Sequence, residues 1–200
     1  MADRAGALLA LWNDVEPALD AEYNDWHGHE HVPQRLTVPG ILWGWRYVRM
    51  TAAPTMPRYL TLYGLRDPTV LESEAYDHLL REPTPWSRRM RPALANLTRW
   101  VCMSRGNVNL DAIDQIAVVT LSEAQAGGAG GIENWLATTS LRCLLRAERQ
   151  PTARPLPWLV PGQAQGIDGQ WLLCLAVDGD RDVDRAASIG ATNYAILSPD

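Results

Sequence analysis

Residues 41–50 read ILWGWRYVRM, a run of strand length in which large apolar residues recur at every second position. A period of two places neighbouring side chains on opposite faces of a strand. The alternation assigns Ile41, Trp43, Trp45 and Tyr47 to one face and Leu42, Gly44, Arg46 and Val48 to the other. The run therefore predicts a half-buried strand, from which the elements on either side can be placed.

The flanking segments predict a β-α-β-β-α-β order within about the first 105 residues. Apolar spacing and turn residues predict the remaining elements of this part. They are strands over 7–13, 58–65 and 96–104, a helix over 17–31, a helix over 67–81 and a short helical piece over 85–93. This order is that of the ferredoxin-like split βαβ motif.

The same order of elements recurs in the second part of the chain. The expected strands cover 115–121, 154–160, 170–177 and 191–197, and the expected helices cover 132–147 and 182–189. We therefore divide the chain into a first half, 1–105, a linker, 106–112, and a second half, 113–200. A four-stranded antiparallel sheet with its helices on one side needs a cover for its other face. The predicted class is α+β, with two tandem ferredoxin-like (βαββαβ) halves packed sheet to sheet as an internal pseudo-dimer.

Composition excludes several classes of function. The chain has 18 arginines, no lysine and a net charge of −5, and no basic face is evident, so nucleic acid is not an expected partner. Without lysine there is no Schiff-base residue and no phosphate-loop lysine. No apolar run suits a membrane span, and no signal peptide is apparent. We expect a cytoplasmic protein with reduced thiols at Cys102, Cys143 and Cys174.

The histidines are the main candidates for chemistry near neutral pH. His27 and His31 are four residues apart and share one helix face, whereas His29 faces solvent. An imidazole in an apolar pocket stays neutral and acts as a general base. The alternative for His31 is a hydrogen bond to backbone where the helix ends, with its charged form favoured by the helix dipole.

A metal site built from His27, His31 and His78 is another interpretation, because an i, i+4 pair suits two imidazole ligands. The chain shows no second ligand pair and no matching carboxylate motif. We therefore expect no metal and no cofactor.

Arg46 and the aromatic residues complete the candidate site. Arg46 alternates away from Trp45 and Tyr47 and needs a partner, for which Glu30 or an anionic substrate is expected. The predicted catalytic residues are His31, His27, Tyr47 and Arg46, with Tyr63 as another candidate for stabilising an oxyanion. The predicted substrate-binding residues are Trp12, Tyr23, Trp26, Trp43, Tyr63, His78 and Trp86.

A set of short motifs in the first half resembles the dimeric α/β-barrel superfamily, specifically its EthD-like and related members. The motifs are Glu22-Tyr23-Asn24-Asp25-Trp26, Glu30-His31-Val32-Pro33, Pro39-Gly40, Arg46-Tyr47, and, downstream, residues 57–63, 73–76 and 85–87. The resemblance covers about the first 100 residues and implies a pocket between the sheet and the helices of the first half. The superfamily includes isomerases, polyketide cyclases, dehydratases, cofactor-free monooxygenases and haem proteins, so the fold alone does not choose the reaction.

The expected function is a cofactor-independent acid/base enzyme of isomerase, cyclase or dehydratase type, acting on a small unsaturated or aromatic carbonyl compound. His31, with His27, supplies the base and acid. The alternatives are a cofactor-free monooxygenase acting on a phenolic substrate and a protein that binds haem or another small ligand. The second half contains no histidine, so we expect one site per chain, in a monomer or a homodimer whose partner is a small organic molecule.

Overall fold

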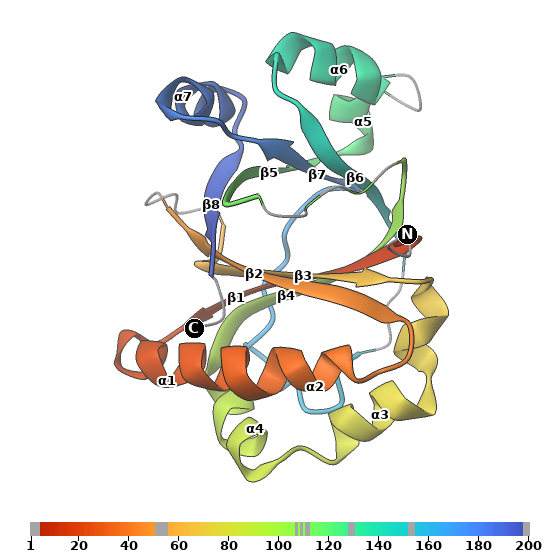
Figure 1. Ribbon diagram of the computed structural model, residues 1–200, viewed down its shortest axis with the longest axis vertical. Helices are drawn as coiled ribbons and strands as arrows, with labels where there is room; N and C mark the ends of the chain where they lie inside the picture. The colour runs from red at the N-terminus through yellow and green to blue at the C-terminus, as the bar shows by residue number, and fades with distance from the viewer. Residues whose placement is uncertain are drawn as a thin grey trace.

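The computed structural model describes residues 5–50, 56–106, 108, 110, 113–127, 131–151 and 155–197. Its strands form a closed antiparallel barrel in the order β1-β3-β2-β8-β5-β7-β6-β4 (Figure 1). The strands are β1 Ala7–Val15, β2 Ile41–Arg49, β3 Tyr59–Leu65, β4 Leu94–Ser104, β5 Gln115–Leu121, β6 Cys143–Arg149, β7 Trp171–Ala176 and β8 Thr192–Ile196. The fold is thus mixed α+β, as expected.

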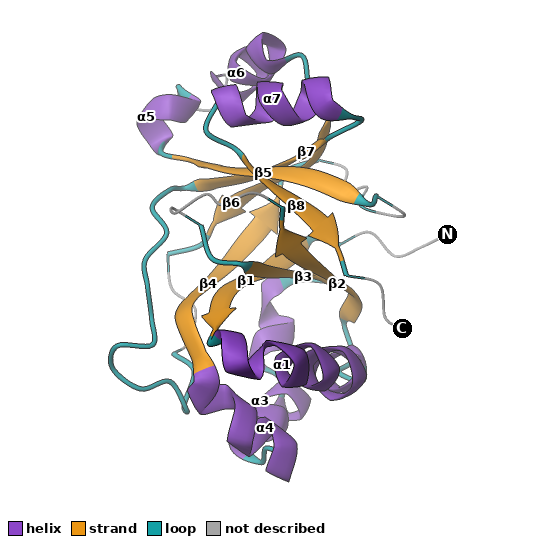
Figure 2. Cartoon of the chain, turned by 90° about the vertical axis from the view of Figure 1, so that its left-hand side faces the viewer, coloured by secondary structure: helices purple, strands orange, loops and turns teal. Residues whose placement is uncertain are grey.

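Helices cover the barrel at two opposite ends (Figures 1 and 2). One end carries η1 Pro17–Leu19, α1 Asp20–Trp26, η2 His27–His31, α2 Val32–Leu36, η3 Pro68–Glu72, α3 Glu74–Arg81, α4 Pro85–Met90 and η4 Arg91–Ala93. The other end carries α5 Glu123–Ala126, α6 Gly131–Thr139 and α7 Asp180–Ser188. Among the described residues, no helix has the length and apolar character needed to cross a membrane.

The two predicted sheets join through their edges, in place of two separate sheets stacked face to face. Residues 47–49 of β2 pair with residues 194–196 of β8, and residues 102–104 of β4 pair with residues 147–149 of β6. An open edge presents unpaired N–H and C=O groups, and barrel closure satisfies them. The inner faces of both sheets therefore line one shared interior.

The barrel interior is apolar and rich in aromatic side chains. Trp12 and Trp100 lie edge to face there, with ring centroids 5.5 Å apart, next to the buried Tyr47. Trp43 and Trp45 pack against the same interior. Ile41 does not share their face, because the pairing of β2 with β3 shifts between Ile41 and Trp43 and turns Ile41 toward the helices.

Three predicted elements need correction. The first helix does not end at His31 but continues through Pro33 to Leu36. The helix expected over 132–147 ends at Thr139, because Ser140 adopts a positive φ of 56°, and Cys143–Arg149 is strand β6. The strand expected over 154–160 is absent from its described part, 155–160, where Pro155 and Pro157 have no N–H for a ladder.

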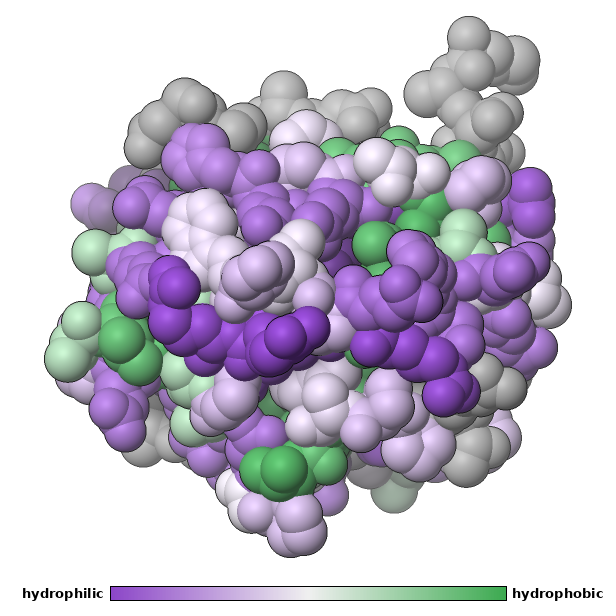
Figure 3. Space-filling model, turned by 90° about the horizontal axis from the view of Figure 1, so that it is seen from below, coloured by the Kyte–Doolittle hydropathy of each residue, from purple (hydrophilic) through white to green (hydrophobic). Residues whose placement is uncertain are grey.

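On the end formed by α1–α4, the surface is mostly hydrophilic and its apolar side chains lie in small separate patches (Figure 3). The apolar sides of these helices therefore face the sheet. The candidate site lies in this layer between the helices and the outer face of β1, β3 and β4.

Candidate active site

A single widened helical turn places the two central histidines. In η2, a π-helix, the N–H of Val32 donates to the carbonyl of His27, five residues earlier. The His27 and His31 rings stack with centroids 4.7 Å apart and an interplanar angle of 22°. Both residues are almost fully buried, at 4% and 6% exposure. Turns of this kind occur frequently at functional sites.

Gly28 allows an arginine to approach this turn. A Cβ atom at position 28 would lie 3.0 Å from Nη1 of Arg46, so any larger residue would displace the guanidinium group. Arg46 donates to Oδ1 of Asn24 at 2.7 Å, and its Cζ lies 5.9 Å from the centroid of the Tyr23 ring. Of the two partners expected for Arg46, Glu30 and an anionic substrate, the first is wrong, because Arg46 bonds to Asn24 and not to Glu30. Arg46 has no ion pair with a carboxylate of the described residues.

The histidines line a small cavity of about 30 Å³. Its polar lining consists of Asn13, His27, His31 and Arg35, and its other lining residues are Leu11, Tyr76, Leu80, Leu94, Leu97, Leu156 and Trp158. This volume corresponds to about one water molecule. His27, His31 and Arg35 follow each other at intervals of four residues, which is why one helix can direct all three into the cavity.

The environment keeps both imidazoles neutral at pH 7. Burial lowers the pKa of His27 well below its usual range, and the charges of Arg46 and Arg35 lower it further. Burial likewise lowers the pKa of His31, and nearby Arg35 is the next cause. Neither ring forms a hydrogen bond to any residue that the structure describes, and Nδ1 of each ring is enclosed. The alternative in which His31 binds backbone at a helix end is therefore not observed.

Arg35 makes the cavity electropositive. It is 4% exposed, and its Nη1 atom has no hydrogen-bond partner among the described residues. A buried cation without a partner is costly, because neither water nor a protein group replaces its lost hydration. The cavity thus combines two neutral bases with a cation that pairs with no carboxylate of the described ranges.

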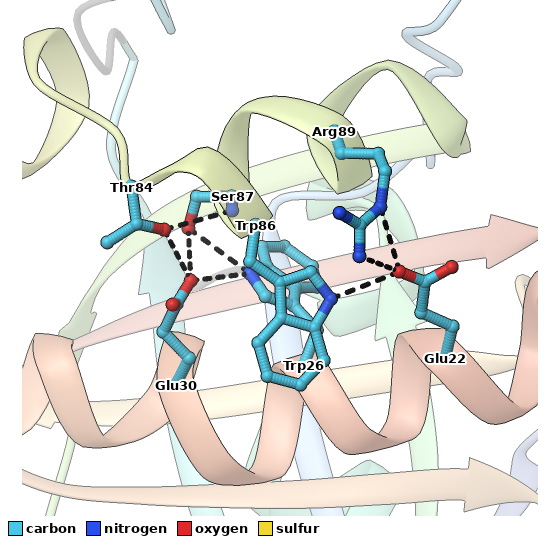
Figure 4. Close-up of polar contacts among 7 residues, drawn as sticks. All are labelled: Glu22, Trp26, Glu30, Thr84, Trp86, Ser87 and Arg89. Carbon is cyan, nitrogen blue, oxygen red and sulfur yellow. Dashed lines mark hydrogen bonds and ion pairs between the residues drawn. The ribbon is translucent and has the colours of Figure 1, made fainter.

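Glu30 ties the widened turn to helix α4 (Figure 4). Its Oε1 accepts from Trp26 Nε1 at 3.1 Å, from Thr84 Oγ1 at 2.6 Å and from Ser87 Oγ at 3.0 Å. The Trp26 ring in turn packs against His31 with centroids 4.4 Å apart. Glu30 therefore orients His31 through Trp26, and it forms no hydrogen bond or ion pair with a histidine or an arginine in the part of the chain that the structure describes.

A second set of polar contacts between the helices involves Trp86, which was predicted to bind substrate. Its Nε1 donates to Glu22 Oε1 at 3.2 Å, and Arg89 pairs with the same carboxylate (Figure 4). Trp86 is only partly buried and does not line the histidine cavity. The structure thus places it in the contact between α1 and α4.

Two tyrosines lie beside the cavity without lining it. The Tyr23 hydroxyl donates to Asn13 Oδ1 at 3.1 Å, and its ring centroid lies 5.1 Å from that of His27. Tyr63 is fully buried under Gly44, and its hydroxyl has no partner among the described residues. A phenol is protonated at neutral pH, and burial raises the pKa of both tyrosines further above this range.

The other predicted site residues are not brought to this cavity. Trp12, Trp43 and Tyr47 belong to the barrel interior, on the opposite face of the sheet. His78 is exposed on α3, where its Nδ1 lies 3.3 Å from Glu82 Oε1. His78 therefore cannot join His27 and His31 around one metal. No cluster of three or more potential metal-ligating side chains occurs in the described part of the chain.

Sequence reasoning missed several residues of the cavity. Arg35 had a usable signal, its spacing of four from His31. Leu156 and Trp158 had none, because they belong to the second half and reach the cavity only through the tertiary fold.

The cavity does not fit a haem group. A volume of about 30 Å³ is far too small for a porphyrin, and Arg35 and Arg46 act on both imidazoles with the charge that disfavours a bound metal cation. The residues instead suit a neutral ligand that gives a proton to an imidazole and becomes an anion beside Arg35.

Solved structures show the same fold as this chain, although their sequences differ widely from it. A structure described as an anthrone oxidase-like protein is 12% identical, with a TM-score of 0.57 over 96% of this chain and 91% of its own. A candidate monooxygenase from Fusobacterium nucleatum subsp. nucleatum is 11% identical, with a TM-score of 0.52 over 97% and 94% of the two chains. A candidate chlorite dismutase is 8% identical, with a TM-score of 0.55 over 96% and 95%.

No protein-family model and no curated protein matches the chain. This chain shares the overall fold of these structures, and its membership of the dimeric α/β-barrel superfamily stays a prediction. Membership of the EthD-like group stays a prediction.

Proposed function

We propose that the protein is a cofactor-independent enzyme that removes a proton from an enolisable carbonyl compound or a phenol. His31 is the general base, His27 is the second imidazole beside it, and Arg35 binds the anion that forms. The observation that carries this proposal is a pair of neutral imidazoles beside a buried guanidinium group, none of which has a hydrogen-bond partner among the described residues.

The chemistry follows from this arrangement. The neutral imidazole takes a proton from a C–H next to a carbonyl, or from a phenolic O–H, and becomes an imidazolium ion. The electron pair stays on the substrate as an enolate or phenolate, which Arg35 stabilises by charge and hydrogen bonding. Return of the proton to another atom isomerises the substrate, and loss of a leaving group completes an elimination.

A second candidate function uses the same anion. The names of two structural neighbours, an anthrone oxidase-like protein and a candidate monooxygenase, favour reaction with dioxygen, although they support it by analogy of fold alone. The enolate carbon would reduce O₂ and form a C–O bond, and the imidazolium proton would complete a hydroperoxide. Loss of water then leaves a carbonyl, so that a CH₂ group and O₂ give C=O and H₂O.

Proton exchange tests the shared first step. Anthrone and 1-tetralone are enolisable aromatic ketones, and their acidic C–H groups exchange in D₂O without air. We expect the protein to accelerate this exchange, and His31→Gln to slow it at least about a hundredfold because general-base catalysis has that size. His78→Gln, on the exposed face of α3, is the matched control and should keep full activity.

Oxygen uptake then separates the two functions. Consumption of O₂ with formation of a ketone product indicates the monooxygenase, and exchange without uptake indicates an isomerase or lyase. A folded His31→Gln protein with wild-type exchange overturns the assignment of the base. If the wild-type protein does not accelerate C–H exchange of either ketone or at C1 of 2-naphthol, the proposal as a whole is overturned.

The order of the strands in the barrel supports a second proposal, that the chain consists of two equivalent halves. The first four strands lie in the order β4-β1-β3-β2 and the last four in the equivalent order β8-β5-β7-β6. This equivalence supports a tandem pair of ferredoxin-like halves divided near residues 106–112. It also supports one site per chain, since the histidines lie only in the first half.

A further inference from the structure

The histidine cavity alone cannot hold the substrate that its chemistry suits. Its volume of about 30 Å³ holds about one water molecule, whereas an aromatic ketone needs several times that room. A larger chamber of about 210 Å³ lies next to it, and Leu97 and Leu156 line both spaces. These two side chains are therefore the partition between the cavity and the chamber.

A segment of the second half forms the outer wall of this chamber. Residues 155–167 belong to the β6–β7 connection and are here called the strap; they run from the helix layer of the first half back along β4 toward β7 (Figure 1). The N–H of Leu97 donates to the Gln163 carbonyl at 2.7 Å, and the N–H of Gln165 donates to the Leu97 carbonyl at 3.1 Å. The strap is thus fixed to β4 around residues 163–165.

The other end of the strap is held differently. The backbone hydrogen bonds of residues 156–160 run within the strap, from Leu159 to Leu156 and from Gln163 to Val160. Leu156 itself rests among apolar side chains of the first half. Because Leu97 belongs to a strand and Leu156 to a turn held by side-chain packing, Leu156 is the part of the partition that can yield to a ligand.

The chamber has an apolar wall and two arginines, Arg99 and Arg149. Leu159 and Ile167 are among its apolar lining residues, and Arg149 lies at its edge with Cζ 4.7 Å from the centroid of the Trp100 ring. Arg149 is half-buried, and its guanidinium group forms no ion pair with any carboxylate of the described residues. This combination suits a planar organic group that carries a carboxylate.

We propose that the chamber is a second subsite of the active site and binds the distal part of an elongated aromatic substrate with an acidic group. Arg149 pairs with that group, and Leu156 moves to let the reactive end reach His31. The placement of the reactive end rests on the proposed function, whereas anion binding by Arg149 does not depend on it.

Binding of two matched ligands tests the anion subsite. 2-Naphthoate and its neutral isostere 2-naphthamide are titrated into the full chain by isothermal calorimetry. We expect Arg149→Gln to weaken 2-naphthoate binding at least about tenfold and to change 2-naphthamide binding less than twofold. Arg142→Gln, an exposed arginine outside the chamber, is the control and should change neither.

The proposed subsite is overturned if 2-naphthoate does not bind the wild-type protein at millimolar concentration. It is also overturned if the wild-type and Arg149→Gln proteins bind 2-naphthoate with equal affinity. Equal weakening of both ligands also overturns it, because a loss without charge selectivity indicates a structural role.

The partition is tested through the histidines themselves. In protein labelled with ¹⁵N-histidine, 2-naphthoate should shift the His31 ring signals, and Leu156→Ala should tighten binding by joining the two spaces. Val160→Ala, at an exposed position of the strap, is the control. If 2-naphthoate leaves the His31 ring signals unchanged in both the wild-type and the Leu156→Ala protein, the proposed opening between the chamber and the histidine cavity is overturned. If proton exchange fails while 2-naphthoate binding still requires Arg149, the proposed function falls and the anion subsite stands.

Discussion

His27 and His31 share a pocket in which burial and the charges of Arg35 and Arg46 lower both imidazole pKa values. A base must be unprotonated to work, so the rate falls only when the pH drops through the pKa of the folded state. We expect kcat/KM for ketone exchange to be flat from pH 8 through pH 6.5 and to decline only well below that pH.

Removing Arg35 tests the electrostatic cause. Because its positive charge lowers the pKa of His31, Arg35→Met should raise that pKa and move the acid limb of the profile to higher pH. The same variant should lower kcat/KM about a hundredfold, since it removes the group that binds the anion. Arg88→Met, at an exposed position of α4, should leave the profile unchanged. An acid limb that stays in place in Arg35→Met would show that the charge of Arg35 does not set the pKa of His31, and would leave burial with the charges of Arg91 and Arg46 as the causes.

Gly28 offers a milder change at the same site. In Gly28→Ala, the new Cβ would contact Arg46 Nη1 at 3.0 Å, and the guanidinium group, as the end of a flexible side chain, moves away. A guanidinium group that lies farther from His27 lowers the pKa of that imidazole less, so the pKa of His27 should rise while the fold persists. NMR titration of the histidine rings measures this shift, and Arg46→Gln should reproduce its direction. A lowered His27 pKa in Gly28→Ala would contradict this account.

The contact between the widened turn and α4 depends on one carboxylate. Glu30→Ala leaves Trp26, Thr84 and Ser87 without their shared acceptor, so we expect a loss of about 1–3 kcal/mol in the free energy of unfolding, measured with urea. Glu82→Ala removes an exposed partner of His78 and should change stability by less than about 0.5 kcal/mol. Glu30→Ala should also lower kcat, because Trp26 no longer holds the His31 ring. Equal stability of the two variants would remove Glu30 from this role.

Alternation and apolar spacing predicted correctly those strands whose sequence pattern is clear over a few neighbouring residues. Strand β5 matches the predicted range 115–121, and alternation correctly grouped Trp43, Trp45 and Tyr47 on one face of β2, which faces the barrel interior. The side of Ile41 was predicted incorrectly, since a bulge in β2 has no clear signature in the residues. The apolar pair Leu144 and Leu145 fits a helix as well as a strand, which extended the predicted helix into β6.

The site shows the same division between local and distant information. The spacing of four between His27 and His31 was enough to place both on one face. The role of Glu30 depends on Thr84 and Ser87, more than fifty residues away, and the cavity wall depends on Leu156 in the second half. The spacing of residues around the histidines contains no signal for those contacts.

The barrel unites the two halves more closely than two stacked sheets would. Its interior contains Leu62 and Trp100 from the first half and Leu172 and Tyr194 from the second, all of them buried. Neither half can cover its inner face without the other, and neither can satisfy its edge strands alone. The halves should therefore unfold as one cooperative unit.

A core substitution in the second half tests this unity through the first. Leu172 is fully buried, and Leu172→Ala should cost about 2–5 kcal/mol. If the molecule unfolds as one unit, native-state hydrogen exchange should show the same loss of protection in β3 of the first half as in β7. Ala187→Gly, at an exposed position of α7, is a control expected to affect mainly local opening of that helix. Loss of protection confined to β7 would mean that the first half is stable alone. In that case the histidine cavity would form without the strap, and the strap would only cover it.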